Sequence, residues 1–193
     1  LFAFRDHISA LLDIPVGDVT VVPLEIGGGF GGKGQGGVYL EPVAAVLSKK
    51  SGSAVKITMT RAEVFMGTGP TSGTAMEIKL GASKDGKLTA VKARLTFEAG
   101  AFPGSPVAGG SRTMLGPYVI PNAYVEGLDV VTNVQKSSAY RAPGSPASAF
   151  AIETAIDEIA EKLDIDPIEF RLLNAAEEGT RQPANGPVYR KIG

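Results

Sequence analysis

The residues best suited to chemistry lie in one glycine-rich stretch, which runs from Glu25 to Tyr39. Its central part, from Gly27 to Gly37, holds eight glycines, one large apolar side chain, Phe30, and one cation, Lys33. Because glycine loses more backbone entropy on folding than any other residue, a cluster of glycines is favoured only where φ is positive or where a ligand must approach the main chain. Exposed backbone N–H groups form a concave donor surface for a phosphate, an oxyanion or a metal-bound oxygen. A solvated linker would gain nothing from Phe30, so we interpret the stretch as a binding loop.

Two nucleotide-binding motifs overlap this stretch, and neither is complete. Gly27 to Lys33 fits the G-x-x-x-x-G-K of a P-loop, but Gly34 stands where Ser or Thr must hold Mg²⁺. Gly27, Gly29 and Gly32 also fit G-x-G-x-x-G. The residues that follow, G-Q-G-G, cannot start the helix that would receive a pyrophosphate. The pattern therefore disfavours a nucleotide-binding enzyme.

A second candidate loop lies far along the chain, at residues 140–144, with the sequence Y-R-A-P-G. It directly precedes a predicted helix from about Pro146 to Leu163. Since a helix N-terminus carries partial positive charge, Arg141 and this helix would together attract an anion. The structural alternative is that Arg141 pairs with a nearby carboxylate.

These loops and the segments between them resemble the molybdenum hydroxylases, the xanthine dehydrogenase and aldehyde oxidase family, in their molybdopterin-binding large subunit. The resemblance begins with G-G-G-F-G-G-K at 27–33 and covers nearly the whole chain. The other matching segments are E-P-V-A-A-V-L at 41–47, T-R-A-E at 60–63, D-G-K-L-T-A at 85–90, A-G-A-F at 99–102, Y-R-A-P-G at 140–144, and D-E-I-A-E-K-L-D-I-D-P-I-E-F-R-L-L-N at 157–174. The resemblance implies that the chain is an internal fragment of that subunit.

The resemblance also implies a set of site residues. Phe30 and Arg141 would lie at the metal, acting mainly through backbone N–H groups. The residues expected to bind the molybdopterin-type molybdenum cofactor are Gly28, Gly29, Phe30, Gly31, Arg141 and Ala142. The family's catalytic glutamate would lie beyond the end of this chain and a metal-facing glutamine upstream of Leu1, so we expect no catalytic residue within it and no activity of the fragment alone.

The activity implied is oxidation of an aldehyde or an N-heteroaromatic carbon, with water as the oxygen source. Purine-oxidising members carry a glutamate where this chain has Gly34, a phenylalanine at Pro143 and an arginine near Gly109, with Arg112 out of register. These departures argue against xanthine as the substrate. Ala142 stands where the carbon monoxide dehydrogenase branch places a cysteine, which argues against that activity.

The implied partners are the remaining part of the large subunit, iron–sulfur and FAD subunits, and a small-molecule substrate. Iron–sulfur clusters and FAD would be bound only on other domains or subunits. The resemblance implies a cytoplasmic location, with a periplasmic parent complex as the alternative. A different class of function stays open: a non-catalytic binding or assembly module of the same fold without molybdenum.

Composition excludes several other classes of function. The net charge of −1, with no stripe of Lys or Arg, disfavours nucleic acid as a partner. The absence of cysteine excludes disulfides and iron–sulfur ligation by this chain. No apolar run approaches the roughly 20 residues of a membrane span. His7, the single histidine, lies beside an apolar helical stripe and receives no catalytic role.

The remaining patterns predict the elements that must position the two loops. Helical spacing predicts a helix around Phe4, Ile8 and Leu11. Further helices are expected at 41–52, 146–163 and 167–174. Strands are expected at 19–24, at 54–60, on both sides of a turn at 85–86 and at 125–134, and an irregular loop at 99–110.

These elements predict an α+β fold. We expect an antiparallel or mixed sheet with packed helices, belonging to the cofactor-binding region of a larger subunit. Residues 1–193, of which 44% are hydrophobic, would form one partial molybdopterin-binding-type domain with an irregular tail from about residue 175.

Overall fold

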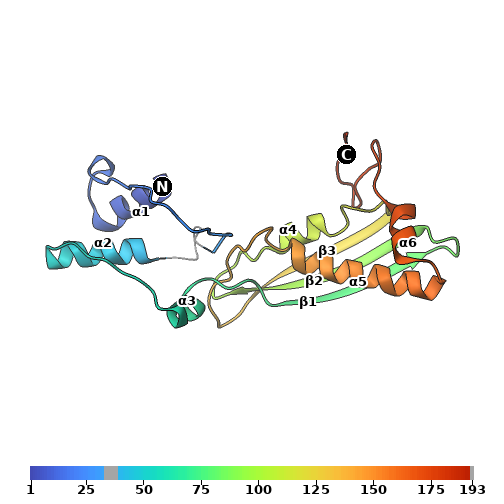
Figure 1. Cartoon of the computed structure of the whole chain (residues 1–193), viewed down its shortest axis with the longest axis horizontal. Coiled ribbons are helices and arrows are strands. Elements are labelled where there is room, and N and C mark those ends of the chain that lie inside the picture. The colour runs from blue at the N-terminus through green and yellow to red at the C-terminus, as the bar shows by residue number, and fades with distance from the viewer. Residues whose placement is uncertain (33–38, 192–193) are drawn as a thin grey trace. The chain divides into compact units, whose positions relative to one another are not determined.

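The computed structural model describes residues 1–32 and 39–191, and its chain divides into two compact units (Figure 1). Unit 1 comprises Leu1–Pro70 and Ser138–Arg141, and unit 2 comprises Thr71–Ser137 and Ala142–Gly193. The described residues form six α-helices and a three-stranded mixed sheet, which confirms the α+β prediction. The expectation that these units form a single partial domain stays a prediction.

The sheet belongs to unit 2 and has the order β1-β2-β3. Strands β1 (Thr74–Ala82) and β2 (Leu88–Gly100) pair antiparallel around the predicted turn at Gly86, where φ is positive. Strand β3 (Asn122–Val131) pairs parallel to β2 and begins three residues earlier than predicted. A parallel neighbour requires a crossover connection. Here the connection contains helix α4 (Val107–Thr113).

The core of unit 2 lies between this sheet and two helices, α4 and α5 (Ser145–Leu163). Alternate residues of β2, including Leu95 and Phe97, are almost completely buried. Helix α5 packs against this face with an apolar stripe in which Ile152 and Ile156 are buried. Strand alternation and helical periodicity therefore meet at one interface.

Helix α6 (Pro167–Asn174) closes the end of this core. The Asp166 side chain caps it by accepting hydrogen bonds from the amides of Ile168 and Glu169. Arg171 forms ion pairs with Glu153 and Asp157 of α5, at 2.8 and 2.7 Å. The tail beyond α6 consists of turns, extended segments and isolated bridges, such as the one between Arg181 and Val188.

Helix α4 corrects the sequence prediction, which placed an irregular loop at residues 99–110. Gly109 and Gly110 oppose helix formation by their intrinsic propensity. Their lack of side chains is what allows α4 to pack closely, because a Cβ on Gly109 would lie 2.7 Å from the carbonyl oxygen of Pro143. Tertiary packing therefore overrides local propensity at this position.

The described residues of unit 1 form four helical segments. They are α1 (Phe2–Leu12), a 3₁₀ turn η1 (Val16–Asp18), α2 (Leu40–Ser51) and α3 (Arg61–Gly67). Helices α1 and α2 were predicted, and Lys49 of α2 donates a hydrogen bond to the carbonyl of Leu12 at 2.6 Å. Helix α3 was not predicted, although the capping box formed by Thr60 and Glu63 is a sequence signal for its start.

Two predicted strands of unit 1 are wrong, because residues 19–24 and 54–60 pair with no other strand in the described part of the chain. The second segment keeps its alternation, with Val55, Ile57 and Met59 half-buried and their neighbours exposed. In the first, Val22 and Leu24 are mostly exposed. A pleated pattern makes a strand only where a neighbour supplies the ladder of hydrogen bonds.

Candidate functional site

The glycine-rich loop of unit 1 makes a tight turn at Phe30. The amide of Gly32 donates a hydrogen bond to the carbonyl of Gly29 at 2.8 Å, and φ is +49° at Phe30 and +96° at Gly31. Positive φ at both central residues defines a type I′ turn. This conformation is rare for a bulky residue such as Phe30, and strained residues of this kind cluster at functional sites. The Phe30 ring packs against Gly28, and 60% of Phe30 is exposed.

The second loop contacts the first directly, although 111 positions (141 − 30) separate Arg141 from Phe30 in the sequence. The Arg141 amide donates a hydrogen bond to the carbonyl of Phe30 at 2.8 Å. A Cβ on Gly31 would overlap the carbonyl of Ala139. Glycine at position 31 therefore permits both the positive φ and the close approach of the two backbones.

This contact leaves several donors unused. In the part of the chain that the structure describes, the amides of Gly29, Phe30 and Gly31 donate no hydrogen bond, and the Arg141 guanidinium is exposed with no hydrogen bond or carboxylate partner. The alternative in which Arg141 pairs with a nearby carboxylate is therefore not observed. The Arg141 amide is bonded to Phe30 in this structure, and the expectation that Arg141 acts through this amide stays a prediction. The guanidinium is the donor group of Arg141 that has no partner among the described residues.

Ala142 begins the part of the second loop that belongs to unit 2. Its φ is +56°, and its carbonyl accepts a hydrogen bond from Ser145 at 3.0 Å, where α5 begins. The next turn is held by α4, since the Thr113 hydroxyl lies 2.8 Å from that of Ser145. The backbone around Ala142 is thus fixed by helices on both sides of it in the sequence.

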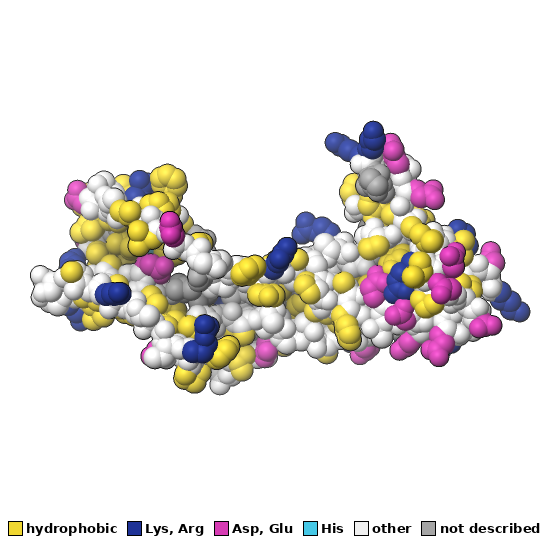
Figure 2. All heavy atoms as spheres, viewed as in Figure 1, with side chains coloured by type: hydrophobic (Ala, Val, Ile, Leu, Met, Phe, Trp, Pro, Cys, Tyr) yellow, Lys and Arg dark blue, Asp and Glu magenta, His cyan; other side chains and the backbone are white. Residues whose placement is uncertain are grey.

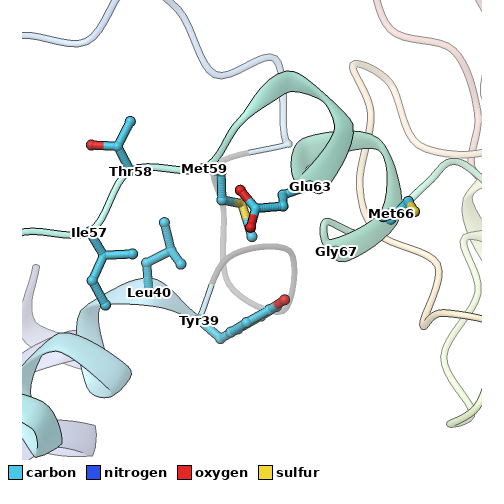
Figure 3. A pocket seen from close by; sticks show the side chains of 8 residues that line it. All are labelled: Tyr39, Leu40, Ile57, Thr58, Met59, Glu63, Met66 and Gly67. Carbon is cyan, nitrogen blue, oxygen red and sulfur yellow. The ribbon is translucent and has the colours of Figure 1, made fainter.

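Unit 1 also contains a pocket of about 360 Å³, which neither Phe30 nor Arg141 lines. Figure 3 shows Tyr39 and Leu40 facing the extended segment at Ile57 and the helix that carries Glu63. The Glu63 carboxylate accepts hydrogen bonds from the Thr60 amide at 2.7 Å and from its hydroxyl at 2.8 Å. These bonds lower the pKa of Glu63, so this carboxylate caps α3 as an anion and is unsuited to act as a general acid.

Sequence reasoning missed one residue of this site, Ala139, whose carbonyl closes against Gly31. No pattern in the sequence marks it, because its role depends on a backbone contact between distant segments. Lys33 and Gly34, which entered the motif analysis, lie outside the described residues. Across residues 1–32 and 39–191, no helix has the length and apolar character needed to span a bilayer.

Comparison with known proteins gives the family. The family model described as "Molybdopterin cofactor-binding domain" matches residues 1–175. The putative xanthine dehydrogenase molybdenum-binding subunit XdhA of Escherichia coli is 36% identical over 189 residues, which are 94% of this chain and 24% of that protein. The nicotinate dehydrogenase large molybdopterin subunit of Eubacterium barkeri is 31% identical, over 98% of this chain and 45% of that protein.

The fold likeness agrees with these matches. The crystal structure of quinoline 2-oxidoreductase from Pseudomonas putida 86 superimposes with a TM-score of 0.89 and 28% identity, over 98% of this chain and 25% of that one. The chain therefore spans a quarter to less than half of the length of the proteins it resembles.

Proposed function

The chain belongs to the molybdopterin cofactor-binding domain family of xanthine dehydrogenase and aldehyde oxidoreductase large subunits, and from this premise we propose that its Phe30 turn and Arg141 loop bind the molybdenum cofactor of a larger hydroxylase. The residues involved would be Gly28, Gly29, Phe30, Gly31, Arg141 and Ala142.

One observation carries this proposal: the hydrogen bond from the Arg141 amide to the Phe30 carbonyl, which joins two irregular loops distant in sequence. The loop amides at Gly29–Gly31 have no acceptor in the described residues, and the positive-φ backbone at Phe30 and Gly31 is held by the contact of Gly31 with Ala139. Preorganised amides and an unpaired guanidinium suit the anionic oxygens of a metal cofactor and its phosphate. These residues therefore fit the group that the family binds.

Within the site, each residue would have a different task. The amides of Gly29–Gly31 would donate to anionic oxygens, and the exposed Phe30 ring would present an apolar wall that excludes water. The Arg141 guanidinium would neutralise charge, since its amide is occupied by Phe30. When bound, the cofactor supplies the redox chemistry that places a water-derived oxygen on an electron-poor carbon.

For the substrate we propose an aldehyde or an N-heteroaromatic carbon. Pro143 and Gly109 support this over a purine, because neither provides the aromatic or cationic side chain expected at those positions. The nicotinate and quinoline enzymes named among the similar proteins act on N-heteroaromatic compounds, as their names state. Electrons would pass to iron–sulfur and FAD groups on other domains or subunits, and the cytoplasmic location stays a prediction.

The test is molybdenum analysis of the intact parent protein and of matched glycine variants. We expect about one molybdenum per large subunit in the unmodified protein and a loss of most of it in Gly31→Ala, because the new Cβ would overlap the Ala139 carbonyl and favour negative φ. Gly27→Ala is the control, since nothing lies within 4 Å of the added Cβ.

Unchanged molybdenum in a folded Gly31→Ala protein would contradict the role of these loops. A parent protein without molybdenum, even when it is produced in cells that make the cofactor, would instead favour a binding or assembly module. Oxidation of aldehydes and N-heterocycles by the molybdenum-loaded protein then tests the proposed substrate class.

A further inference from the structure

The open face of the sheet in unit 2 carries rows of side chains that the strand register brings together. One row aligns Glu77, Arg94 and Glu126, and the next aligns Lys79, Lys92 and Tyr124. The first row carries two glutamates and one arginine, with Arg94 and Glu126 in an ion pair at 3.2 Å.

The second row carries two positive charges and no negative charge. Lys79 and Lys92 are direct cross-strand partners, both are exposed, and neither has a carboxylate partner among the described residues. Like charges directly opposite one another destabilise a sheet. An arrangement that costs stability in the free chain is expected where a ligand of opposite charge compensates for it.

The two lysines lie in a shallow depression of about 580 Å³. The Lys92 ammonium lies 5.8 Å from the centre of the Tyr124 ring, and this tyrosine is 57% exposed. The turn at Ala184 and Asn185, where φ is +56° and +60°, forms one rim. An exposed tyrosine and a turn with positive φ at non-glycine residues are both features found at recognition surfaces.

We propose that this surface, defined by Lys79, Lys92, Tyr124 and Asn185, binds an acidic segment of another polypeptide. Charge complementarity requires carboxylates, and the spacing of two facing lysines suits two acidic side chains of one segment. The depression is open along the sheet, which suits an extended chain, whereas small-molecule sites bury most of their ligand. Tyr124 offers the apolar contact that such interfaces use as an anchor.

The experiment titrates a blocked hexaglutamate peptide into the ¹⁵N-labelled 193-residue chain at low ionic strength. We expect amide shifts confined to the neighbourhood of the four surface residues, and a loss of affinity of about tenfold or more in Lys79→Glu and in Lys92→Glu. Neither variant should unfold, because each replaces a like-charge pair by an opposite-charge pair.

Lys84→Glu is the matched control, since Lys84 is an exposed lysine in the turn between β1 and β2 and does not line the depression. An equal loss of affinity in Lys84→Glu would show nonspecific attraction and overturn the proposal. So would an absence of binding. Pyrophosphate is the second ligand to titrate. If it shifts the same amide resonances with an affinity equal to that of hexaglutamate, the surface is a small-anion site and the proposal of polypeptide docking is overturned.

Discussion

The two units differ in how they are held together. Every described residue that is fully buried lies in unit 2, whereas unit 1 has none in its described part. Figure 2 shows apolar side chains exposed over α1 and α2, and they include Phe2, Leu11 and Leu47. Burial of apolar surface is the main favourable term in folding. Unit 2 therefore has a core of its own, and the Phe30 turn lies in unit 1, whose described residues form none.

This difference has a physical reason. A loop that presents its amides to a ligand must leave them unpaired, and glycines that permit such a backbone contribute no side chain to a core. Outside its own Gly32–Gly29 hydrogen bond, the Phe30 turn is accordingly fixed by one hydrogen bond from Arg141 and one close contact with Ala139. Local stability is expected to be lowest where so few groups are buried.

The largest expected effect follows from removing a core leucine. Leu95→Ala in β2 removes a completely buried side chain, and we expect it to lower the free energy of unfolding by about 2–5 kcal/mol. Leu24→Ala in unit 1 alters a residue that is 83% exposed, and we expect a change within about 0.5 kcal/mol. Urea denaturation followed by circular dichroism measures both. Equal losses of unfolding free energy in the two variants would show that the two units do not differ in how burial stabilises them.

The second prediction concerns alkaline pH and unit 2. Burial, and then the hydrogen bonds from its hydroxyl to Glu153, raise the pKa of Tyr118 above its ordinary value. A raised pKa in the folded state gives stability that is complete below the unfolded pKa, which is about 10, and is lost as pH rises above it. We expect stability to fall with a slope of up to about 1.4 kcal/mol per pH unit from this group.

Tyr118→Phe isolates this effect, because it removes the titrating hydroxyl and keeps the ring in the core. The free energy of unfolding should therefore fall less steeply above pH 10 in this variant than in the unmodified chain, although its stability at neutral pH is lower. Urea denaturation between about pH 8 and 11 measures this difference. If the free energy of unfolding falls equally steeply with pH in both proteins, the role of Tyr118 is refuted.

The third prediction tests unit 1 through its capping box. Thr60→Ala removes the hydroxyl that accepts from the Glu63 amide, and we expect a loss of about 1 kcal/mol in the stability of α3. Hydrogen exchange of the α3 amides measures this loss, and the pKa of Glu63 should rise toward its ordinary value. Thr58→Ala, at an exposed position of the same unit, is the control. Similar exchange in both variants would contradict the capping role.

The smallest expected effect is a gain in stability in unit 2. Lys79→Glu should raise the free energy of unfolding by about 0.5 kcal/mol, because a cross-strand pair of opposite charge replaces the like-charge pair with Lys92. High salt should reduce this gain. A loss of stability in urea denaturation would show that the two lysines do not repel one another.

The sequence predicted most of unit 2, because its elements follow local rules. The stripe of Ile152 and Ile156, the turn at Gly86 and the cap at Asp166 each act within a few residues of chain. The same holds for α1 and α2 in unit 1. The sequence also identified both candidate loops, because a cluster of glycines around one phenylalanine is recognisable without coordinates.

Only the tertiary structure decided what depends on distant segments. Helix α4 forms in a glycine-containing segment because that segment packs against Pro143. Residues 19–24 and 54–60 form no strand because no partner strand lies beside them in the described chain. The tertiary structure also placed the Arg141 amide on the Phe30 carbonyl and left the guanidinium free of partners among the described residues. Periodicity and capping are set by neighbours in sequence, whereas this contact joins residues 111 positions (141 − 30) apart, whose approach depends on the whole fold.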